Sequence, residues 1–248
     1  MPTRRYHDDA QRHPIKPYHA TVLSILQAER AQRVLDAPCG QGWLGHALRR
    51  RGEPVQVEGL SLWEFPLEGD GYASAREHDL ETPLPAHCAE FDAVVCAEAL
   101  HLVRNPGLLL EGFARAVRPG GRIIITTPNT WYLGSRLQFL LRGYHAGFRP
   151  SVGRQRGEYI PFFPLSYPQL HLFFESVGLE DIRLHEVDEP KPRRWTERML
   201  AWPARMYLSG RQRRAQDATE QNYWADAARD QALHGRWLVM SARRRQAR

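Results

Sequence analysis

The sequence predicts an α/β protein built on a doubly wound, mostly parallel sheet of seven strands. In the first half of the 248-residue chain, short apolar segments alternate with helical patterns, as in a parallel sheet with crossover helices. Two segments, FDAVVC at 91–96 and RIIITT at 122–127, are almost continuously hydrophobic, which is typical of strands buried on both faces. A third observation is the glycine turn Gly40-Gln41-Gly42, which joins a predicted strand to a predicted helix.

The first half is expected to hold five strands, at 33–37, 54–57, 75–78, 91–96 and 122–127. The glycine turn leads into a helix over 43–51, which Gly52 ends. Asn105 and Pro106 predict the start of another helix, because asparagine caps helices and proline suits the first helical position. This order of elements is that of a doubly wound core.

The second half is less regular and predicts a helix over 168–176 and two closing strands at 181–187 and 236–242. We expect one domain over 1–248, with its core at about 16–129, 163–188 and 236–242. The two long insertions, 130–162 and 189–235, are expected to form a helical and aromatic cap over one edge of the core. Prolines 190, 192 and 203 should break the helical pattern of the second insertion, and the arginines at 243–245 should follow the last strand as solvated chain.

Composition excludes several classes of protein. No run of apolar residues is long enough to span a membrane, and the first residues lack the apolar run of a secretory signal. Cys39, Cys88 and Cys96 have no paired spacing, so neither a disulfide framework nor a cysteine zinc site is predicted, and no metal site is expected. We therefore expect a soluble, cytoplasmic protein.

The net charge is +6, and the 34 basic residues include only two lysines, Lys16 and Lys191. This bias is compatible with the base composition of the genome or with attraction to phosphates, carboxylates or anionic lipids. Charge alone does not choose among these partners.

The glycine loop at 36–42 indicates a ligand site, because glycines let the backbone approach a ligand closely at the carboxyl edge of a sheet. It is a poor match to the dinucleotide fingerprint, since Pro38 stands where the first glycine belongs. Taken alone, Gly40 and Gly42 could also serve only to pack a helix closely on a strand.

Two segments, RVLDAPCGQGWLGHAL and FDAVVCAEALHLVRNPGLLLEGFARAVRPGGRIIITTPN, resemble class I S-adenosylmethionine-dependent methyltransferases. Within them the chain is similar to the group that includes quinone-biosynthesis O-methyltransferases and enzymes encoded near glycan-assembly genes. The resemblance covers 34–129 well and 163–187 more loosely. It implies a Rossmann-like fold and S-adenosyl-L-methionine as the cofactor.

The resemblance also implies which residues bind the cofactor. The residues expected at its amino-acid end are Asp36, Ala37, Cys39, Gly40 and Gly42. A carboxylate is suitable there because this cofactor carries an ammonium and a sulfonium, both cationic.

The ribose and adenine contacts are expected after the second and third strands. The family usually places an acidic residue against the ribose hydroxyls, whereas this chain has Ser61, followed by Leu62, at the matching position. Glu58 and Glu64 are nearby carboxylates, although neither falls in register. The residues expected at the adenine ring are Asp79, at its amino group, and Leu80, against its face.

Two further residues are expected beside the reacting methyl group. Cys96 ends the fourth strand and is interpreted as a small buried hydrophobic residue. His101 lies in a segment where relatives often carry histidine, and we hypothesise that its neutral imidazole takes the proton of a hydroxyl acceptor. The alternative is a histidine that only bonds the backbone at a helix start.

Both insertions carry aromatic and basic residues. In the first, aromatic residues from Trp131 to Phe148 alternate with Arg136, Arg142 and Arg149, a pattern that can stack on rings and pair with phosphate or carboxylate, or form a satellite core with solvated charges. In the second, the segment 193–207 carries an apolar stripe at helical spacing, made of Trp195, Met199, Trp202 and Met206. This stripe is compatible with packing on the protein's own core, packing on a second subunit, or docking on an anionic membrane.

Together these observations predict an S-adenosylmethionine-dependent methyltransferase that acts on an oxygen of a small-molecule, glycan or lipid-linked acceptor. Alternatives are a methyltransferase for a quinone or other aromatic precursor and a non-catalytic methyltransferase-like partner protein. A nucleic-acid enzyme is disfavoured, because the Asn/Asp-Pro-Pro-aromatic signature of resembling amino-directed enzymes is missing after the fourth strand. The oligomeric state stays open.

Overall fold

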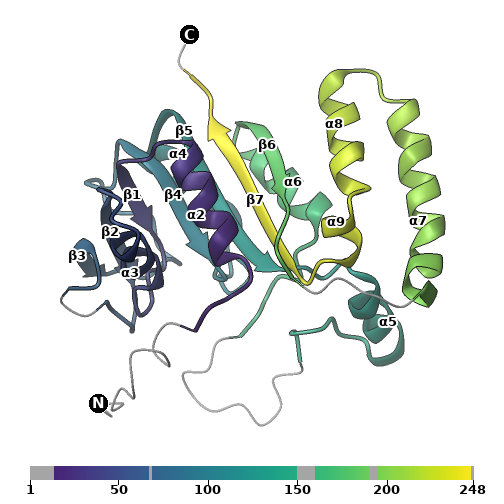
Figure 1. Cartoon of the computed structure of the whole chain (residues 1–248), viewed down its shortest axis with the longest axis horizontal. Coiled ribbons are helices and arrows are strands. Elements are labelled where there is room, and N and C mark those ends of the chain that lie inside the picture. The colour runs from purple at the N-terminus through teal and green to yellow at the C-terminus, as the bar shows by residue number, and fades with distance from the viewer. Residues whose placement is uncertain (1–13, 67–68, 150–159, 190–194, 247–248) are drawn as a thin grey trace.

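The computed structural model describes residues 14–66, 69–149, 160–189 and 195–246. Within them, seven strands form one sheet in the order β3-β2-β1-β4-β5-β7-β6. Neighbouring strands are parallel, except that β7 runs antiparallel to both β5 and β6 (Figure 1). The predicted doubly wound, mostly parallel sheet of seven strands is therefore confirmed.

The strands lie close to their predicted positions. Their bounds are β1 Arg33–Asp36, β2 Gln56–Ser61, β3 Tyr72–Glu77, β4 Phe91–Ala97, β5 Val117–Pro128, β6 Leu179–His185 and β7 Trp237–Arg244. The prediction for β2 was two residues early, since Pro54 has no N–H to give to a sheet. The predictions for β3 and β6 were wrong by two or three residues in their starting points.

The expectation that residues 243–245 are solvated chain was wrong for Arg243 and Arg244, which are the last residues of β7. Arg243 pairs with Glu29 and Asp181, and Arg244 donates to the backbone carbonyl of Val117. These partners lie on other elements of the fold, which explains why a local run of arginines gave no sign of them.

The described helices are α2 His19–Ala28, α3 Trp43–Arg50, α4 Pro106–Ala116, α5 Leu133–Arg142, α6 Tyr167–Ser176, α7 Trp195–Arg213, α8 Ala218–Ala227 and α9 Asp230–His234. Asn105 caps α4 by accepting the N–H of Leu108, as predicted. The predicted break at Pro203 was wrong, because α7 continues through it. Ala201 and Leu208, on either side of this proline, are both buried, so tertiary packing holds the helix together.

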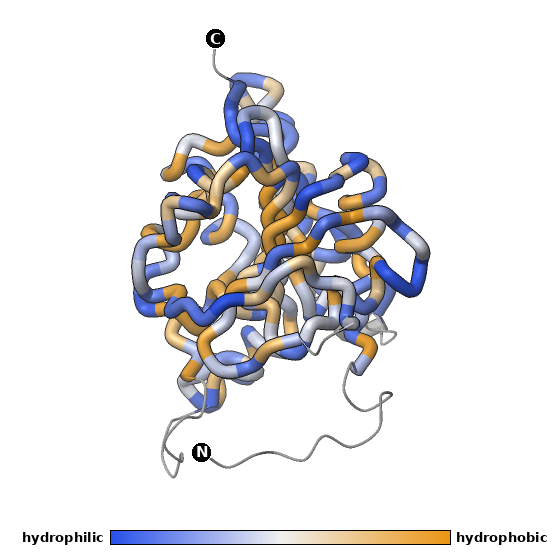
Figure 2. The backbone as a smooth tube through the Cα atoms, turned by 90° about the vertical axis from the view of Figure 1, so that its left-hand side faces the viewer, coloured by the Kyte–Doolittle hydropathy of each residue, from blue (hydrophilic) through white to orange (hydrophobic). Residues whose placement is uncertain are grey.

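Two hydrophobic clusters cover the two faces of the sheet. One packs α2 and α3 against the central strands. The other packs α4 and α6 against the opposite face and extends to α8 and α9. Figure 2 shows the hydrophobic segments gathered along the strands in the interior. The layers therefore leave the ends of the strands as the edges where a site can form.

Helices α7 and α8 lie side by side beyond the β6 edge of the sheet, with α5 near the start of α7 (Figure 1). The apolar stripe predicted on α7 points outward, since the side chains of Met199, Trp202 and Met206 are 62%, 61% and 55% exposed. Packing on the protein's own core is thus excluded for these three residues; the side chain of Trp195 lies outside the described part. None of the helices described is long and apolar enough to span a bilayer.

Candidate active site

The carboxyl ends of the parallel strands meet at one edge of the sheet. There β1 ends at Asp36, β2 at Ser61, β4 at Ala97 and β5 at Pro128. The strand order reverses between β1 and β4, so their connections leave in opposite directions and open a crevice between them. This is the edge at which sequence analysis placed its candidate residues.

The glycine loop is tied to the strands on both sides of β1. The N–H of Ala37 donates to Val95 of β4, and that of Cys39 donates to Leu60 of β2. Gly42 has a φ of +88°, and a Cβ there would lie 2.8 Å from Pro66 Cβ. Glycine is therefore required at this position both by the backbone conformation and by the space available.

Asp36 is fully buried at the end of β1. Its Oδ2 accepts a hydrogen bond from the hydroxyl of Tyr72 at 2.5 Å, whereas its Oδ1 has no partner among the described residues. Burial raises the pKa of this carboxyl to about 7, although the bond from Tyr72 acts in the opposite direction. A buried carboxylate oxygen without a donor is costly, so this position is suited to a cationic or hydrogen-bond-donating ligand.

A second carboxylate lies beside it. Glu98, directly after β4, accepts the hydroxyl of Tyr18 at 2.5 Å and lies 3.8 Å from Nζ of Lys16. The pKa of the Tyr18 phenol is raised by burial and then by the charges of Glu98 and Asp36. The negative charges of both carboxylates thus act on one phenol at the point where the strand order reverses, and such charge makes this crevice favourable for a cation.

Sequence reasoning assigned no role to Tyr18 or Tyr72. Tyr18 is 80 positions from Glu98, and Tyr72 is 36 positions from Asp36. Tyr18 also packs edge-on against Trp43 and Trp237, at ring distances of 6.2 and 5.2 Å. Neither tyrosine lies in a motif, so only the folded chain brings them to the site.

The two cysteines of the site are structural in character. Cys39 and Cys96 are buried, and burial raises the pKa of both thiols, that of Cys96 to about 12. The charge of Asp36 acts in the same direction on both thiols, so the three side chains lie close together. Cys96 accordingly has the properties of a small hydrophobic residue and not of a nucleophile.

After β2 the family usually has an acidic residue at the position of Ser61. In this chain the nearby carboxylate is that of Glu64, three residues later. Ser61 is buried, and Glu64 Oε2 lies 3.9 Å from the position that a Cβ on Gly40 would take. Glu64 therefore lies over the glycine loop. Glu58, by contrast, forms an ion pair with Arg33 at 2.8 Å, near the start of β1.

Asp79 and Leu80 follow β3. The side chain of Asp79 is exposed, and its Oδ1 accepts the N–H of Glu81, so it caps a turn. Leu80 is buried in the larger hydrophobic cluster. The N–H of His78 donates to the carbonyl of Ser61, which keeps this turn next to the end of β2.

His101 is buried beyond the end of β4. Its Nδ1 is 3.4 Å from the Thr127 hydroxyl oxygen, and its ring meets that of Phe148 edge-on at 5.9 Å. The backbone carbonyl of His101 accepts the N–H groups of Phe162 and Phe163. Burial lowers the pKa of the imidazole to about 4, so it is neutral at physiological pH.

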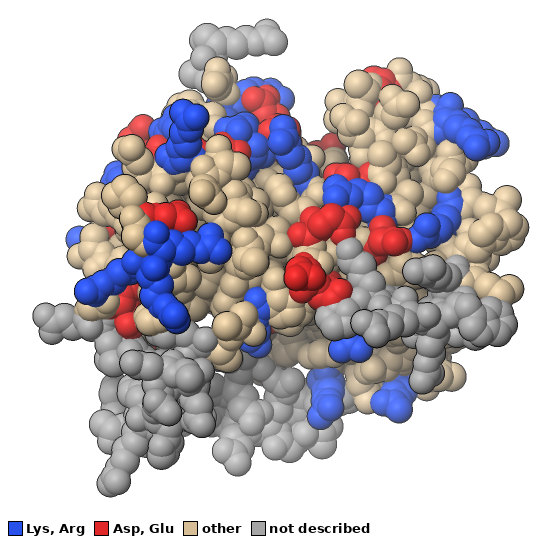
Figure 3. Space-filling view, viewed as in Figure 1, with Lys and Arg blue, Asp and Glu red and all other residues tan. Residues whose placement is uncertain are grey.

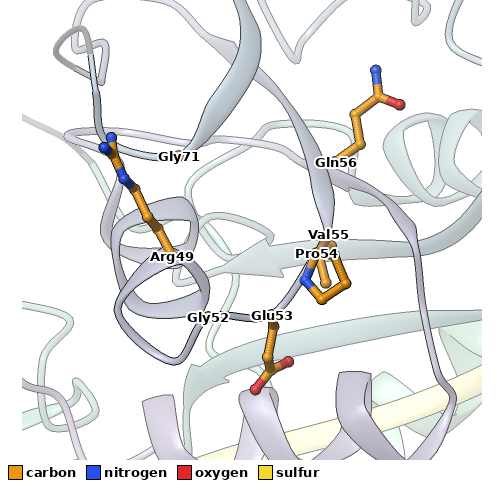
Figure 4. Close-up of a pocket in the computed structure, with 7 residues that line it drawn as sticks. All are labelled: Arg49, Gly52, Glu53, Pro54, Val55, Gln56 and Gly71. Carbon is orange, nitrogen blue, oxygen red and sulfur yellow. The ribbon is translucent and has the colours of Figure 1, made fainter.

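A hollow of about 490 Å³ lies at the other end of β2 (Figure 4). It is lined by Arg49, Gly52, Glu53, Pro54, Val55, Gln56 and Gly71. The side chains of Arg49, Glu53 and Gln56 point in different directions in Figure 4, and Gln56 begins β2 whereas the crevice lies at its end. This hollow is therefore separate from the candidate site.

Within the described ranges, no three His, Cys, Asp or Glu side chains come together as a metal site would require.

Comparison with known proteins identifies relatives of this chain. A family model described as a methyltransferase domain matches residues 8–184. The ubiquinone biosynthesis O-methyltransferase of Idiomarina loihiensis is 30% identical over 202 residues, which cover 75% of this chain and 78% of that enzyme. A similar enzyme of Xylella fastidiosa is 26% identical over 228 residues, covering 90% of this chain and 84% of its own.

Solved structures share the fold at low identity. The chain bound to the Haloferax volcanii Trm112 methyltransferase activator aligns with a TM-score of 0.54 and 16% identity, covering 96% of this chain and 92% of its own. Human N-acetylserotonin methyltransferase in complex with S-adenosylmethionine aligns with a TM-score of 0.51 and 15% identity, covering 93% of this chain and 52% of its own.

Proposed function

Since the chain belongs to the class I S-adenosylmethionine-dependent methyltransferases, we propose that it methylates a hydroxyl oxygen of a small-molecule, glycan or lipid-linked acceptor. The observation that carries this proposal is the pair of carboxylates, Asp36 and Glu98, at the crevice between β1 and β4. A site with two carboxylates and one unpartnered carboxylate oxygen is matched to a cofactor that bears a sulfonium and an ammonium.

S-adenosylmethionine, when bound, supplies an electrophilic methyl group on a cationic sulfur. In this proposal Asp36 and the loop of Ala37, Cys39, Gly40 and Gly42 hold its amino-acid end. Ser61, Leu62 and the neighbouring Glu64 hold the ribose, and Asp79 and Leu80 hold the adenine. Cys96 packs beside the reacting group. The orphaned Oδ1 of Asp36 and the space over Gly40 support this assignment.

His101 is proposed as the base that accepts the proton of the acceptor hydroxyl. In this proposal Nδ1 of His101 donates to the Thr127 hydroxyl, which lies 3.4 Å away. The lone pair is then on Nε2, which takes the proton. Because its pKa is about 4, the imidazole is in the basic, neutral form throughout the physiological range.

The test has two parts. Titration calorimetry with S-adenosylmethionine and with S-adenosylhomocysteine should show micromolar binding; no binding of either would overturn the proposal in favour of a non-catalytic partner.

In the second part, His101→Asn should lower kcat about 100-fold or more, the usual contribution of a general base, with cofactor affinity unchanged. The exposed His87 provides the control, since His87→Asn should leave kcat unaltered. Undiminished turnover by His101→Asn would exclude His101 as the base.

A phenolic precursor of a quinone is the second candidate acceptor, favoured by the similarity to ubiquinone biosynthesis O-methyltransferases of Idiomarina loihiensis and Xylella fastidiosa. A panel of catechols, hydroxylated glycans and hydroxylated lipids, assayed with a methyl-labelled cofactor, distinguishes the two. Methylation confined to the catechols would select the aromatic acceptor; methylation of glycans or lipids alone would select the other class.

For the segment 193–207, the proposal is reversible contact with an anionic membrane. Support comes from the exposed stripe of Met199, Trp202 and Met206 on α7, to which exposed Leu140 and Leu141 of α5 add apolar surface. In Figure 3 uncharged surface lies beside basic side chains on the side of the molecule where α7 and α8 lie. Such a surface is typical of helices that lie in the headgroup region.

Flotation with vesicles that contain 30% anionic lipid tests this contact. The wild-type protein should float with these vesicles and not with neutral ones, and Trp202→Ser combined with Met206→Ser should abolish flotation. The matched control is Leu172→Ser on α6, which removes an equally exposed apolar side chain elsewhere. If no lipid-dependent binding occurs and the chain is dimeric by light scattering, a second subunit covers the stripe instead.

A further inference from the structure

Arg136 on α5 carries a guanidinium group of which one edge is shielded and without a hydrogen-bond partner in the described part of the chain. Its Nε and Nη2 atoms are shielded from solvent, and neither has a hydrogen-bond partner in the described part of the chain. Burial lowers the pKa of this group, and no carboxylate of the described residues contributes to the shift. A shielded, unpaired cation is costly to maintain, so its environment is incomplete without a negative charge.

The positions of the two unpartnered atoms of Arg136 indicate which kind of ligand would satisfy them. Nε and Nη2 lie on the same edge of the planar guanidinium, and this edge donates two parallel hydrogen bonds to two oxygens of one oxyanion. The guanidinium carbon also lies 5.8 Å from the centre of the Trp131 ring. Once the groups that shield this edge move aside, a charged group with two oxygens beside an aromatic ring is thus the chemistry that it can recognise.

Two chains of contacts connect the residues next to Arg136 and Trp131 with the proposed base. In the first, the hydroxyl of the adjacent Ser135 bonds with Nδ1 of His145 at 3.0 Å. The carbonyl of His145 accepts the N–H of Phe148, whose ring packs on the ring of His101. The end of α5 and the turn after it therefore bring this arginine's helix to the side of His101.

The second connection runs through the segment 160–165. At one end, Phe162 and Phe163 donate to the carbonyl of His101. At the other end, the Thr130 hydroxyl bonds the carbonyl of Leu165 at 2.8 Å, next to Trp131. Trp131 and His101 thus border the same segment, and both follow carboxyl ends of neighbouring strands, β5 and β4.

We propose that Arg136 binds a carboxylate or phosphate group of the methyl acceptor, so that the acceptor is an anionic hydroxyl compound. This inference rests on the proposed function, because it assigns a substrate class to the same site. In this proposal the free protein tolerates an unsatisfied guanidinium edge in order to select acceptors that carry the complementary charge.

Thermal unfolding at constant ionic strength tests the site without knowledge of the acceptor. In chloride, Arg136→Gln should melt at least as high as the wild type, because it removes an unpaired charge. Replacement of chloride by inorganic phosphate or by sodium benzoate should raise the Tm of the wild type, and should leave the Tm of Arg136→Gln unchanged. A response to benzoate alone identifies a carboxylate, and a response to phosphate alone identifies a phosphate.

Arg142→Gln is the matched control, since Arg142 is the exposed last residue of the same helix and should respond to the anions like the wild type. Equal anion responses of the wild type and Arg136→Gln, including no response in either, would overturn the proposal. Calorimetry with S-adenosylmethionine on the same samples separates the two questions: intact cofactor binding without an anion effect removes only the anion site, whereas absent cofactor binding removes the proposed function.

Discussion

The carboxyl group of Asp36 is fully buried, and only one of its oxygens has a hydrogen-bond donor within the described residues. Its pKa rises from 3.8 to about 7. Between these two values the folded chain holds a proton that the unfolded chain releases, so the free energy of unfolding falls as the pH increases through this range and is constant above it. The side chain therefore destabilises the cofactor-free protein at neutral and alkaline pH, where it is charged and able to bind a cation.

Asp36→Asn should consequently raise stability and remove binding. At pH 8 and without cofactor, its free energy of unfolding should exceed that of the wild type by about 1 kcal/mol or more, which is a rise of roughly 3 °C in Tm. The difference should shrink towards pH 5, where Asp36 is protonated. Calorimetry should show cofactor affinity reduced at least tenfold at pH 8. A variant that melts below the wild type at pH 8 would contradict this account.

At the scale of elements, the turn between β1 and α3 determines how close a ligand can approach the sheet. Gly42 is the N-cap of α3 with a left-handed backbone, and its missing side chain makes room for Pro66 from the loop after β2. Gly52, beyond the other end of α3, also has a positive φ, of +68°, but no atom lies within 4 Å of the position of its Cβ. At one end of α3, Gly42 has a neighbour that a side chain would contact, whereas at the other end Gly52 has none.

Gly42→Ala and Gly52→Ala should therefore differ in a measurable way. Both substitutions place alanine in a left-handed conformation, which costs about 1–2 kcal/mol. Gly42→Ala should cost more, because Pro66 must also move, and should weaken cofactor binding. Chemical denaturation measures the first effect and calorimetry the second. If Gly52→Ala impaired cofactor binding as strongly, the effect would stem from α3 as a whole and not from the loop.

At the scale of the whole molecule, a group of charges joins segments from both ends of the chain. Arg122 on β5 is 1% exposed and pairs with Glu29, after α2, at 3.0 Å, and with Asp181 on β6 at 2.8 Å. Arg243 on β7 pairs with the same two carboxylates. Arg122 is the only one of these four side chains that is buried. The group is distant from the crevice, because Arg122 pairs in register with Ala93 near the start of β4.

Arg122→Ala should lower the free energy of unfolding by about 3 kcal/mol, because it removes a buried side chain together with its ion pairs to Glu29 and Asp181, which keep only Arg243 from this group as a partner. Its Tm should fall by roughly 10 °C, and its cofactor affinity well below that temperature should match the wild type. Arg118→Ala, which removes an exposed partner of Asp92, should cost less than about 1 kcal/mol. Equal losses in the two variants would show that burial adds nothing at Arg122.

The core of the fold could be predicted from sequence, because its signals are local. The apolar runs at 91–96 and 122–127, the cap at Asn105 and the glycine turn each lie within a few residues, and the structure has β4, β5, α4 and the loop where these patterns indicate. The family resemblance extended this prediction to the cofactor and to the residues that follow each strand. Errors were confined to strand ends, to the helix through Pro203 and to the arginines of β7.

The arrangement of charge around those residues could not be predicted in this way. The bonds of Tyr18 to Glu98 and of Tyr72 to Asp36, the unsatisfied edge of Arg136 and the outward face of Met199, Trp202 and Met206 all depend on which distant segments meet. Periodicity gives the face of a helix that is apolar, but not whether protein or solvent covers it. Hydrogen bonding and burial are relations between segments far apart along the chain, and these relations exist only once the sheet has brought its strands together.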